Sequence, residues 1–97
     1  MSESLMQLRK NVERIDSQIV RLLQKRMLLV KEIGALKKEL GLDLIDPLRE
    51  TQVLQHVASL PHDPIPTSTL EGLFLQIIRT SRDLQIPSST ENPKERS

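Results

Sequence analysis

A long helix with a continuous apolar stripe constrains this chain more than any other feature. No proline occurs between residues 5 and 40, and apolar residues recur there at alternating spacings of four and three. This spacing places ten positions on one face of a helix, as in a coiled coil, and we call this stripe the seam. Its positions are Leu8, Val12, Ile15, Ile19, Leu22, Arg26, Leu29, Ile33, Leu36 and Leu40. All are apolar except Arg26.

Short motifs predict where this helix begins and ends. Ser4 and Gln7 have the form of a capping box, in which two side chains satisfy free N–H groups of the first turn. Gly41 follows the last seam position, and a left-handed glycine commonly ends a helix. We therefore expect one helix from about residue 4 to residue 40. The alternative is a break near Gly34, after which the helix folds back.

Two shorter helices are predicted after the long one. Asp46 caps the free N–H groups of the second helix, and Pro47 suits its first position. Ser68 and Glu71 form a further capping box, from which the third helix runs to about Gln85. Proline residues end both helices. With no strand pattern and no internal repeat, the chain is predicted to be all-α.

The length of the seam predicts an oligomer. A helix of about 36 residues is roughly 54 Å long, and two short helices cannot cover a seam of that length. Exposed seam residues would cost roughly 1.5–3 kcal/mol for each large side chain. We therefore expect a two-fold dimer in which the long helices pair. Residues 1–86 are expected to form one domain, followed by a disordered tail over residues 87–97.

The composition excludes several classes of function. There is no cysteine, so disulfides, zinc–thiolate sites and a cysteine nucleophile are excluded. Phe74 is the only aromatic residue, which excludes the stacking surfaces that bind single-stranded nucleic acids. Basic residues are interleaved with the seam, unlike a basic region that precedes a zipper. Apolar runs are too short for a membrane span or a signal peptide, so we expect a cytoplasmic protein that binds neither nucleic acid nor membrane.

Polar residues stand at positions where packing favours apolar ones. Arg26 lies in the seam, and Lys37 lies three turns later and about 20° away on the same face, with the Cα atoms about 16 Å apart. Two such side chains can hold a polar ligand between them. Ser81 and Gln85 extend the apolar stripe of the third helix at a spacing of four. The alternatives are a solvated Lys37, an Arg26 that snorkels or pairs with a core Glu, and a third helix that frays.

Further charged residues add to this pattern. Residues 5–40 carry nine Lys and Arg against four Asp and Glu, so the long helix is basic. Arg9 lies roughly 25 Å from Arg26 along the helix axis, so it can join that site only from the partner of an antiparallel dimer; otherwise it is a surface residue. Arg49 and Glu50 lie in the first turn of the second helix. No general base or nucleophile accompanies them, which favours binding of a small dianion, or catalysis by orientation and electrostatics alone.

In order and spacing, these residues resemble the all-α chorismate mutases. The resemblance covers about residues 5–86 and implies a three-helix, intertwined homodimer. It also implies conversion of chorismate to prephenate on the route to phenylalanine and tyrosine, without a cofactor or metal. The residues that carry it are Leu8-Arg9, Ile15-Asp16, Leu22-Leu23, Lys25-Arg26, Glu32-Ile33-Gly34, Lys37, Asp46-Pro47-Leu48-Arg49-Glu50, Ile77-Ile78, Ser81 and Gln85.

The resemblance implies how the two ends of the substrate are held. Arg26 and the Arg9 of the partner subunit would bind the two carboxylates, with Ser81 assisting. Lys37 and Gln85 would donate hydrogen bonds to the ether oxygen whose bond breaks. Such donors contribute typically about 3–4 kcal/mol where negative charge develops.

The resemblance also implies roles at the start of the second helix, where Glu50 and the backbone near Asp46 would bind the ring hydroxyl and Arg49 would support them. Two related activities remain as alternatives: an isochorismate pyruvate lyase, and an enzyme that acts on aminodeoxychorismate. The intact Asp46–Glu50 run favours the mutase. A non-catalytic dimerisation module, with Arg26 fixing the register, is the other alternative. We expect no fused dehydratase, dehydrogenase or regulatory domain.

Overall fold

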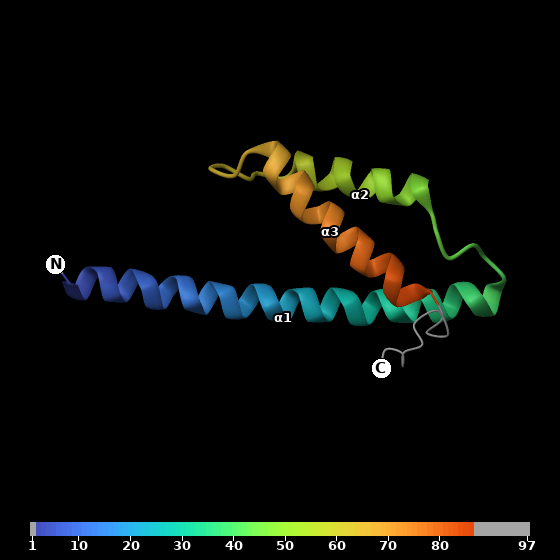
Figure 1. Cartoon of the computed structure of the whole chain (residues 1–97), viewed down its shortest axis with the longest axis horizontal. Helices are drawn as coiled ribbons and strands as arrows, with labels where there is room; N and C mark the ends of the chain where they lie inside the picture. Colours follow the sequence, from blue (N-terminus) through green and yellow to red (C-terminus); the bar gives the residue numbers. More distant parts are fainter. Residues whose placement is uncertain (1, 87–97) are drawn as a thin grey trace, which may run out of the picture.

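The computed structural model of the protein describes residues 2–86, which form three α-helices. These are α1 (Ser2–Leu40), α2 (Pro47–Ser59) and α3 (Thr67–Gln85). In Figure 1, α1 is a long rod, and α3 runs diagonally from the far end of α2 down to α1. This part of the chain contains no strand, so the predicted all-α class is confirmed. The predicted tail, residues 87–97, lies outside the described residues.

The long helix is continuous and ends where the sequence predicts. It runs through Gly34 without a break, so the fold-back alternative is wrong. Gly41 has a φ of 71°, and its N–H donates to the carbonyl of Lys38 at 3.2 Å. The N–H of Leu42 donates to the carbonyl of Lys37 at 2.8 Å. These two bonds are the Schellman motif, which turns the chain sharply toward α2.

The predicted caps are only partly correct. Asp46 accepts a hydrogen bond from the N–H of Arg49 at 3.0 Å, so the cap of α2 is confirmed. Both predicted capping boxes are wrong. Ser4 lies inside α1, which begins at Ser2, so it does not cap the helix. Pro66 has extended backbone angles and occupies the N-cap position of α3. The helix therefore begins at Thr67, one residue before Ser68, and no side chain caps it.

The helix α1 presents two neighbouring stripes to its surroundings. One stripe packs beneath α3 and includes the buried Val30 and Gly34. The other is the seam, whose nine apolar side chains are all 48–63% exposed within the chain. The nine apolar residues of the seam therefore lie mainly beside the stripe that α3 covers, whereas the tenth seam residue, Arg26, contacts Ser81 of α3. Helices α2 and α3 pack on each other, and each contributes one buried apolar residue, Val57 and Ile78.

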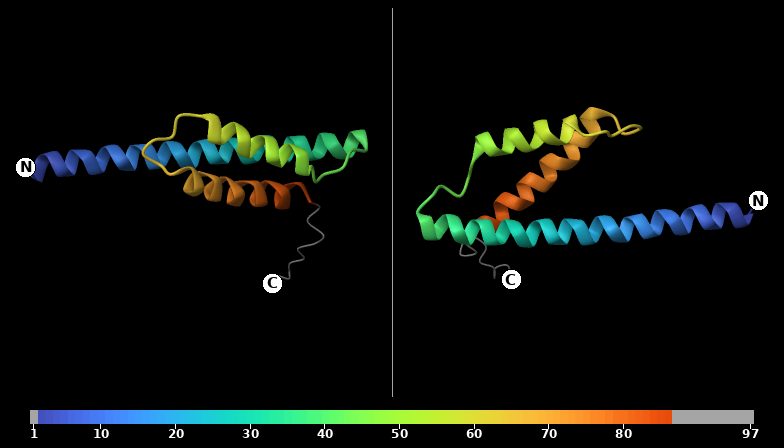
Figure 2. Two further views of the ribbon diagram at one scale, coloured as in Figure 1. Left: turned by 90° about the horizontal axis from the view of Figure 1, so that it is seen from above. Right: turned by 180° about the vertical axis from the view of Figure 1, so that it is seen from behind.

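The single chain is extended and has a small core. It measures 58 × 36 × 20 Å and has a radius of gyration of 17.5 Å, against about 12–13 Å for a compact chain of this length. Figure 2 shows from two sides that the N-terminal part of α1 projects beyond α2 and α3. No helix among residues 2–86 combines the length and the apolar character that crossing a membrane requires.

A close contact between helices fixes how α3 crosses α1. A Cβ atom at Gly34 would lie 3.0 Å from Cγ and 3.3 Å from Cα of Gln85, which is closer than ordinary van der Waals contact. A Cβ atom at Gly72, in α3, would meet no atom within 4 Å. The two glycines therefore differ in the space around them, although both lie within helices.

We expect alanine to affect the two glycines differently. In a helix interior, alanine is favoured over glycine by roughly 0.5–1 kcal/mol, so Gly72→Ala is expected to raise the free energy of unfolding by about that amount. Gly34→Ala is expected to show no such increase in the free energy of unfolding, because the added methyl group would push α3 away from α1 at Gln85. Urea unfolding at one protein concentration measures both variants. Equal stabilisation by the two substitutions would show that Gly34 does not limit the crossing.

Candidate active site

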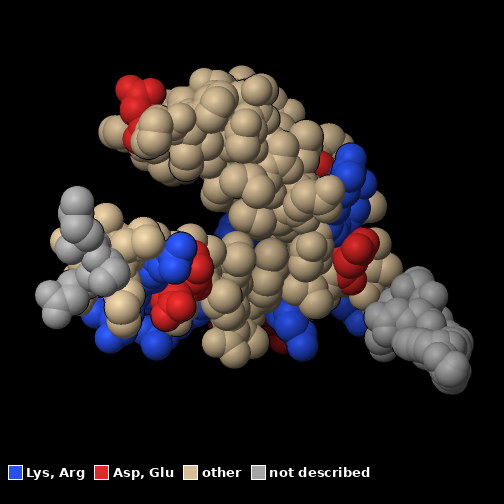
Figure 3. Space-filling model, turned by 60° about the vertical axis from the view of Figure 1, so that its left-hand side comes forward, with Lys and Arg blue, Asp and Glu red and all other residues tan. Residues whose placement is uncertain are grey.

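A cavity of about 200 Å³ lies where the three helices and the α1–α2 loop meet. Figure 3 shows a hollow between α1 and the lobe formed by α2 and α3, with basic side chains at its inner end. Apolar side chains from each helix form part of the cavity wall. Seven of the eight predicted site residues line it: Arg26, Lys37, Asp46, Arg49, Glu50, Ser81 and Gln85.

At one end of the cavity, a buried serine orients Arg26. The guanidinium Nη1 of Arg26 donates a hydrogen bond to Oγ of Ser81 at 2.7 Å. The Ser81 hydroxyl donates its own proton to the carbonyl of Ile77 at 2.8 Å, which leaves its lone pairs to the arginine. Ser81 is only 8% exposed, so the predicted alternative of a frayed helix end is wrong.

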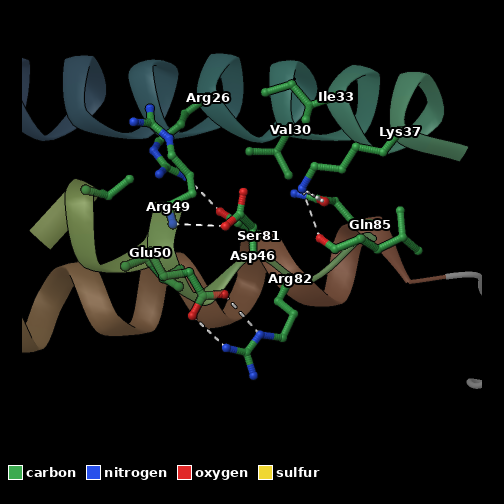
Figure 4. Close-up of a pocket in the computed structure, with 13 residues that line it drawn as sticks. Arg26, Val30, Ile33, Lys37, Asp46, Arg49, Glu50, Ser81, Arg82 and Gln85 are labelled. Carbon is green, nitrogen blue, oxygen red and sulfur yellow. Dashed lines mark hydrogen bonds and ion pairs between the residues drawn. The ribbon is translucent and has the colours of Figure 1, made fainter. Parts of the chain in front are cut away.

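At the other end, Lys37 and Gln85 lie together, directed toward one another in Figure 4. The Lys37 Nζ donates to Oε1 of Gln85 at 3.2 Å and to the carbonyl of Leu44 at 3.0 Å. An ammonium group carries three protons, so one remains for a ligand. The oxygen of the Gln85 amide faces Lys37, and its NH₂ group remains as a second donor. Lys37 is therefore not the solvated side chain of the alternative interpretation.

Arg49 and Arg26 place two positive charges side by side in the close-up (Figure 4). Burial, and in second place the charge of Arg49, lower the pKa of Arg26 below its usual value. Among the side chains that the structure describes, in residues 4–86, the only ion pair joins Arg82 and Glu50. Arg26, Lys37 and Arg49 therefore border the cavity with no carboxylate partner among the described side chains, an arrangement suited to binding an anion.

Glu50 has a partner that the sequence analysis missed. Arg82 Nε and Nη2 donate to the two carboxylate oxygens of Glu50, at 3.2 and 2.7 Å. This hydrogen bonding, together with the charge of Glu50, raises the pKa of Arg82. The two residues are 32 positions apart, and no spacing pattern connects them. The one available signal was that Arg82 directly follows Ser81 on α3.

Arg9, the eighth predicted site residue, lies apart from the other seven. It is exposed near the N-terminal end of α1, beside Leu8, Val12 and Glu13, and does not line the cavity. The chain by itself therefore does not bring Arg9 to the site.

The cavity offers hydrogen-bond donors and positive charge. Across residues 4–86, whose side chains are described, no three His, Asp or Glu side chains gather in a way that could hold a metal ion. The two carboxylates at the cavity are already engaged, one by the cap of α2 and one by Arg82. Such an arrangement can bind and fold a small dianion and stabilise negative charge near Lys37 and Gln85.

Known proteins share this fold and much of this sequence. The sequence model of the family described as chorismate mutase type II matches residues 8–86. A solved chorismate mutase from Thermus thermophilus (form II) is 42% identical in sequence and superposes with a TM-score of 0.79. That match covers 84% of this chain and 92% of the Thermus chain.

Two curated relatives agree in name. The chorismate mutase of Methanocaldococcus jannaschii is 33% identical over 60 residues, which cover 62% of this chain and 61% of that protein. The bifunctional chorismate mutase/prephenate dehydratase of Aquifex aeolicus is 32% identical over 87 residues, which cover 86% of this chain and 24% of that protein. The chain thus spans less than two thirds of either relative. With the match to residues 8–86 and the likeness to the Thermus enzyme, the chain belongs to the chorismate mutase type II family.

Proposed function

We propose that the protein is a chorismate mutase, an isomerase that rearranges chorismate to prephenate on the route to phenylalanine and tyrosine. One observation carries the proposal: Arg26, Lys37 and Arg49 border one small cavity, while the nearby carboxylates are held by other groups. The substrate is a dianion, so this charge distribution complements it. We assign residues 1–86 to the mutase domain.

The reaction needs only the groups that the cavity offers. In this Claisen rearrangement, the ether C–O bond breaks while a C–C bond forms at the other end of the enolpyruvyl group. No proton moves and no nucleophile adds, so neither a general base nor a cofactor is required. The barrier falls when a flexible substrate is held in its compact conformer and when donors face the oxygen that gains negative charge.

Arg26 and Arg9 would hold the two carboxylates. Arg26, already oriented by Ser81, binds one carboxylate through charge-assisted hydrogen bonds. The second carboxylate would bind Arg9 of the partner subunit. The exposed seam supports this assembly, because antiparallel pairing of two α1 helices would cover the seam and bring the start of one helix to the later half of the other.

The remaining residues would act at the centre of the substrate. The third proton of Lys37 and the NH₂ group of Gln85 donate to the ether oxygen as its bond to carbon lengthens. Glu50 accepts a hydrogen bond from the ring hydroxyl, assisted by the backbone near Asp46. Arg49 contributes positive charge beside Arg26 and closes that end of the cavity.

Lys37 provides the first test of this mechanism. We expect Lys37→Ala to lower kcat by about 100- to 1000-fold, the usual effect of losing one donor to a developing oxyanion, with the dimer intact. The loss of chorismate absorbance measures turnover. Lys38→Ala is the matched control, because the neighbouring side chain is exposed. A modest loss at Lys37 would contradict its role.

The same assay separates the alternative functions. Wild-type protein should consume chorismate and form prephenate. Release of pyruvate from isochorismate instead would identify a lyase. A folded dimer that does not turn over chorismate would support the alternative of a non-catalytic dimerisation module.

Gln85 provides a test by pH. Because the amide does not ionise, we expect no acid limb from this position in the wild type. In Gln85→Glu, the carboxyl group donates only when protonated, so activity should rise as the pH falls through its titration. The pH profile of kcat/KM measures this, with the exposed Gln76→Glu on the same helix as control. A pH-independent Gln85→Glu enzyme would exclude Gln85 as a donor.

A mixing experiment tests the shared site. Arg9→Ala and Arg26→Ala homodimers should both be inactive, since each lacks one arginine in both sites. After subunit exchange, each heterodimer would have one site with both arginines, so an equal mixture should regain about a quarter of wild-type activity. Mass spectrometry of the intact dimers confirms exchange. If exchange is complete and activity does not return, the two arginines do not share a site.

A further inference from the structure

Arg82 lies outside the predicted set of site residues, yet it lines the cavity and holds Glu50. We propose that Arg82 is a positioning residue, which fixes the Glu50 carboxylate as the acceptor for the ring hydroxyl of the substrate. The proposal rests on the function proposed above and adds to it a specificity role for a residue outside the predicted set.

The geometry of the pair is that of a two-point clamp. Arg82 comes from α3 and Glu50 from the first turn of α2, and two nitrogens of one guanidinium contact the two oxygens of one carboxylate. The pair lies on the side of the cavity away from α1, as Figure 4 shows. The Arg82 side chain is 40% exposed and the Glu50 side chain 26% exposed, so the arginine is the outer partner.

The clamp orients the carboxylate. A free glutamate side chain rotates about three bonds, whereas parallel hydrogen bonds to a planar guanidinium fix the plane of its carboxylate. Each carboxylate oxygen has two acceptor positions, and the clamp uses one on each. The other positions remain for a hydroxyl group that enters the cavity.

The clamp also removes an electrostatic conflict. Glu50 lines the same cavity as Arg26 and Lys37, where its negative charge would repel a dianion. Arg82 neutralises that charge from the outer side, so the field in the cavity stays positive while an acceptor oxygen is still available. A neutral acceptor would avoid the repulsion but would form a weaker hydrogen bond.

The experiment must separate this role from a purely structural one, in which Arg82 ties α3 to α2. We propose a double-mutant cycle of Arg82→Ala and Glu50→Ala, measured as kcat/KM for chorismate, with thermal unfolding and dimer fraction recorded for each variant. Arg79→Ala is the matched control, because Arg79 is an exposed arginine on the same helix.

We expect Arg82→Ala to lower kcat/KM roughly tenfold, since an aligned, charged hydrogen bond to the substrate is lost. In the Glu50→Ala background, the same substitution should have almost no further effect. Arg82→Lys, which keeps the charge but not the two-point contact, should give an intermediate value. The wild type should prefer chorismate over its ring O-methyl ether, and Arg82→Ala should lose much of this preference.

Two results would overturn the proposal while leaving the mutase function in place. One is a cycle in which the double variant loses kcat/KM by the product of the two single losses, because Arg82 would then act independently of Glu50. The other is a loss of activity in Arg82→Ala and Arg82→Lys that follows the loss of folded dimer, with substrate preference unchanged. Wild-type protein that fails to convert chorismate would overturn both proposals together.

Discussion

The crossing of α3 over α1 at Gly34 is the constraint on which the site depends. Because Gly34 has no side chain, the backbone of α3 at Gln85 approaches α1 closely, and the Gln85 amide reaches Lys37. One turn earlier on α3, Ser81 reaches Arg26 in the same way. A wider crossing would separate both pairs at once, so one small residue holds together the two ends of the cavity.

The charge balance of the site follows from how its carboxylates are used. Asp46 caps α2, and Glu50 is clamped by Arg82, so neither carboxylate forms an ion pair with Arg26 or Arg49. Burial, and after it the charge of Arg49, lower the pKa of Arg26, so both disfavour its charged form. A bound dianion would supply the missing charge.

Fold and proposed function are connected through the seam. Nine large apolar side chains are each about half exposed, so burying the rest of each would gain roughly 0.7–1.5 kcal/mol, about half the value for full burial. Pairing with a second chain would provide that gain and, in the same step, would supply the Arg9 that the single chain cannot bring to its own cavity. Stability and activity would then require the same assembly.

The sequence by itself determined the helices, the end of α1 at Gly41, the cap of α2 and the separate apolar seam, because these depend on residues a few positions apart on one backbone. It also marked Arg26, Lys37, Ser81 and Gln85 as out of place in apolar stripes. Only the tertiary structure decided which stripe α3 covers and that Arg82 clamps Glu50. Those contacts join helices whose facing residues have no fixed spacing in sequence, so packing alone selects them.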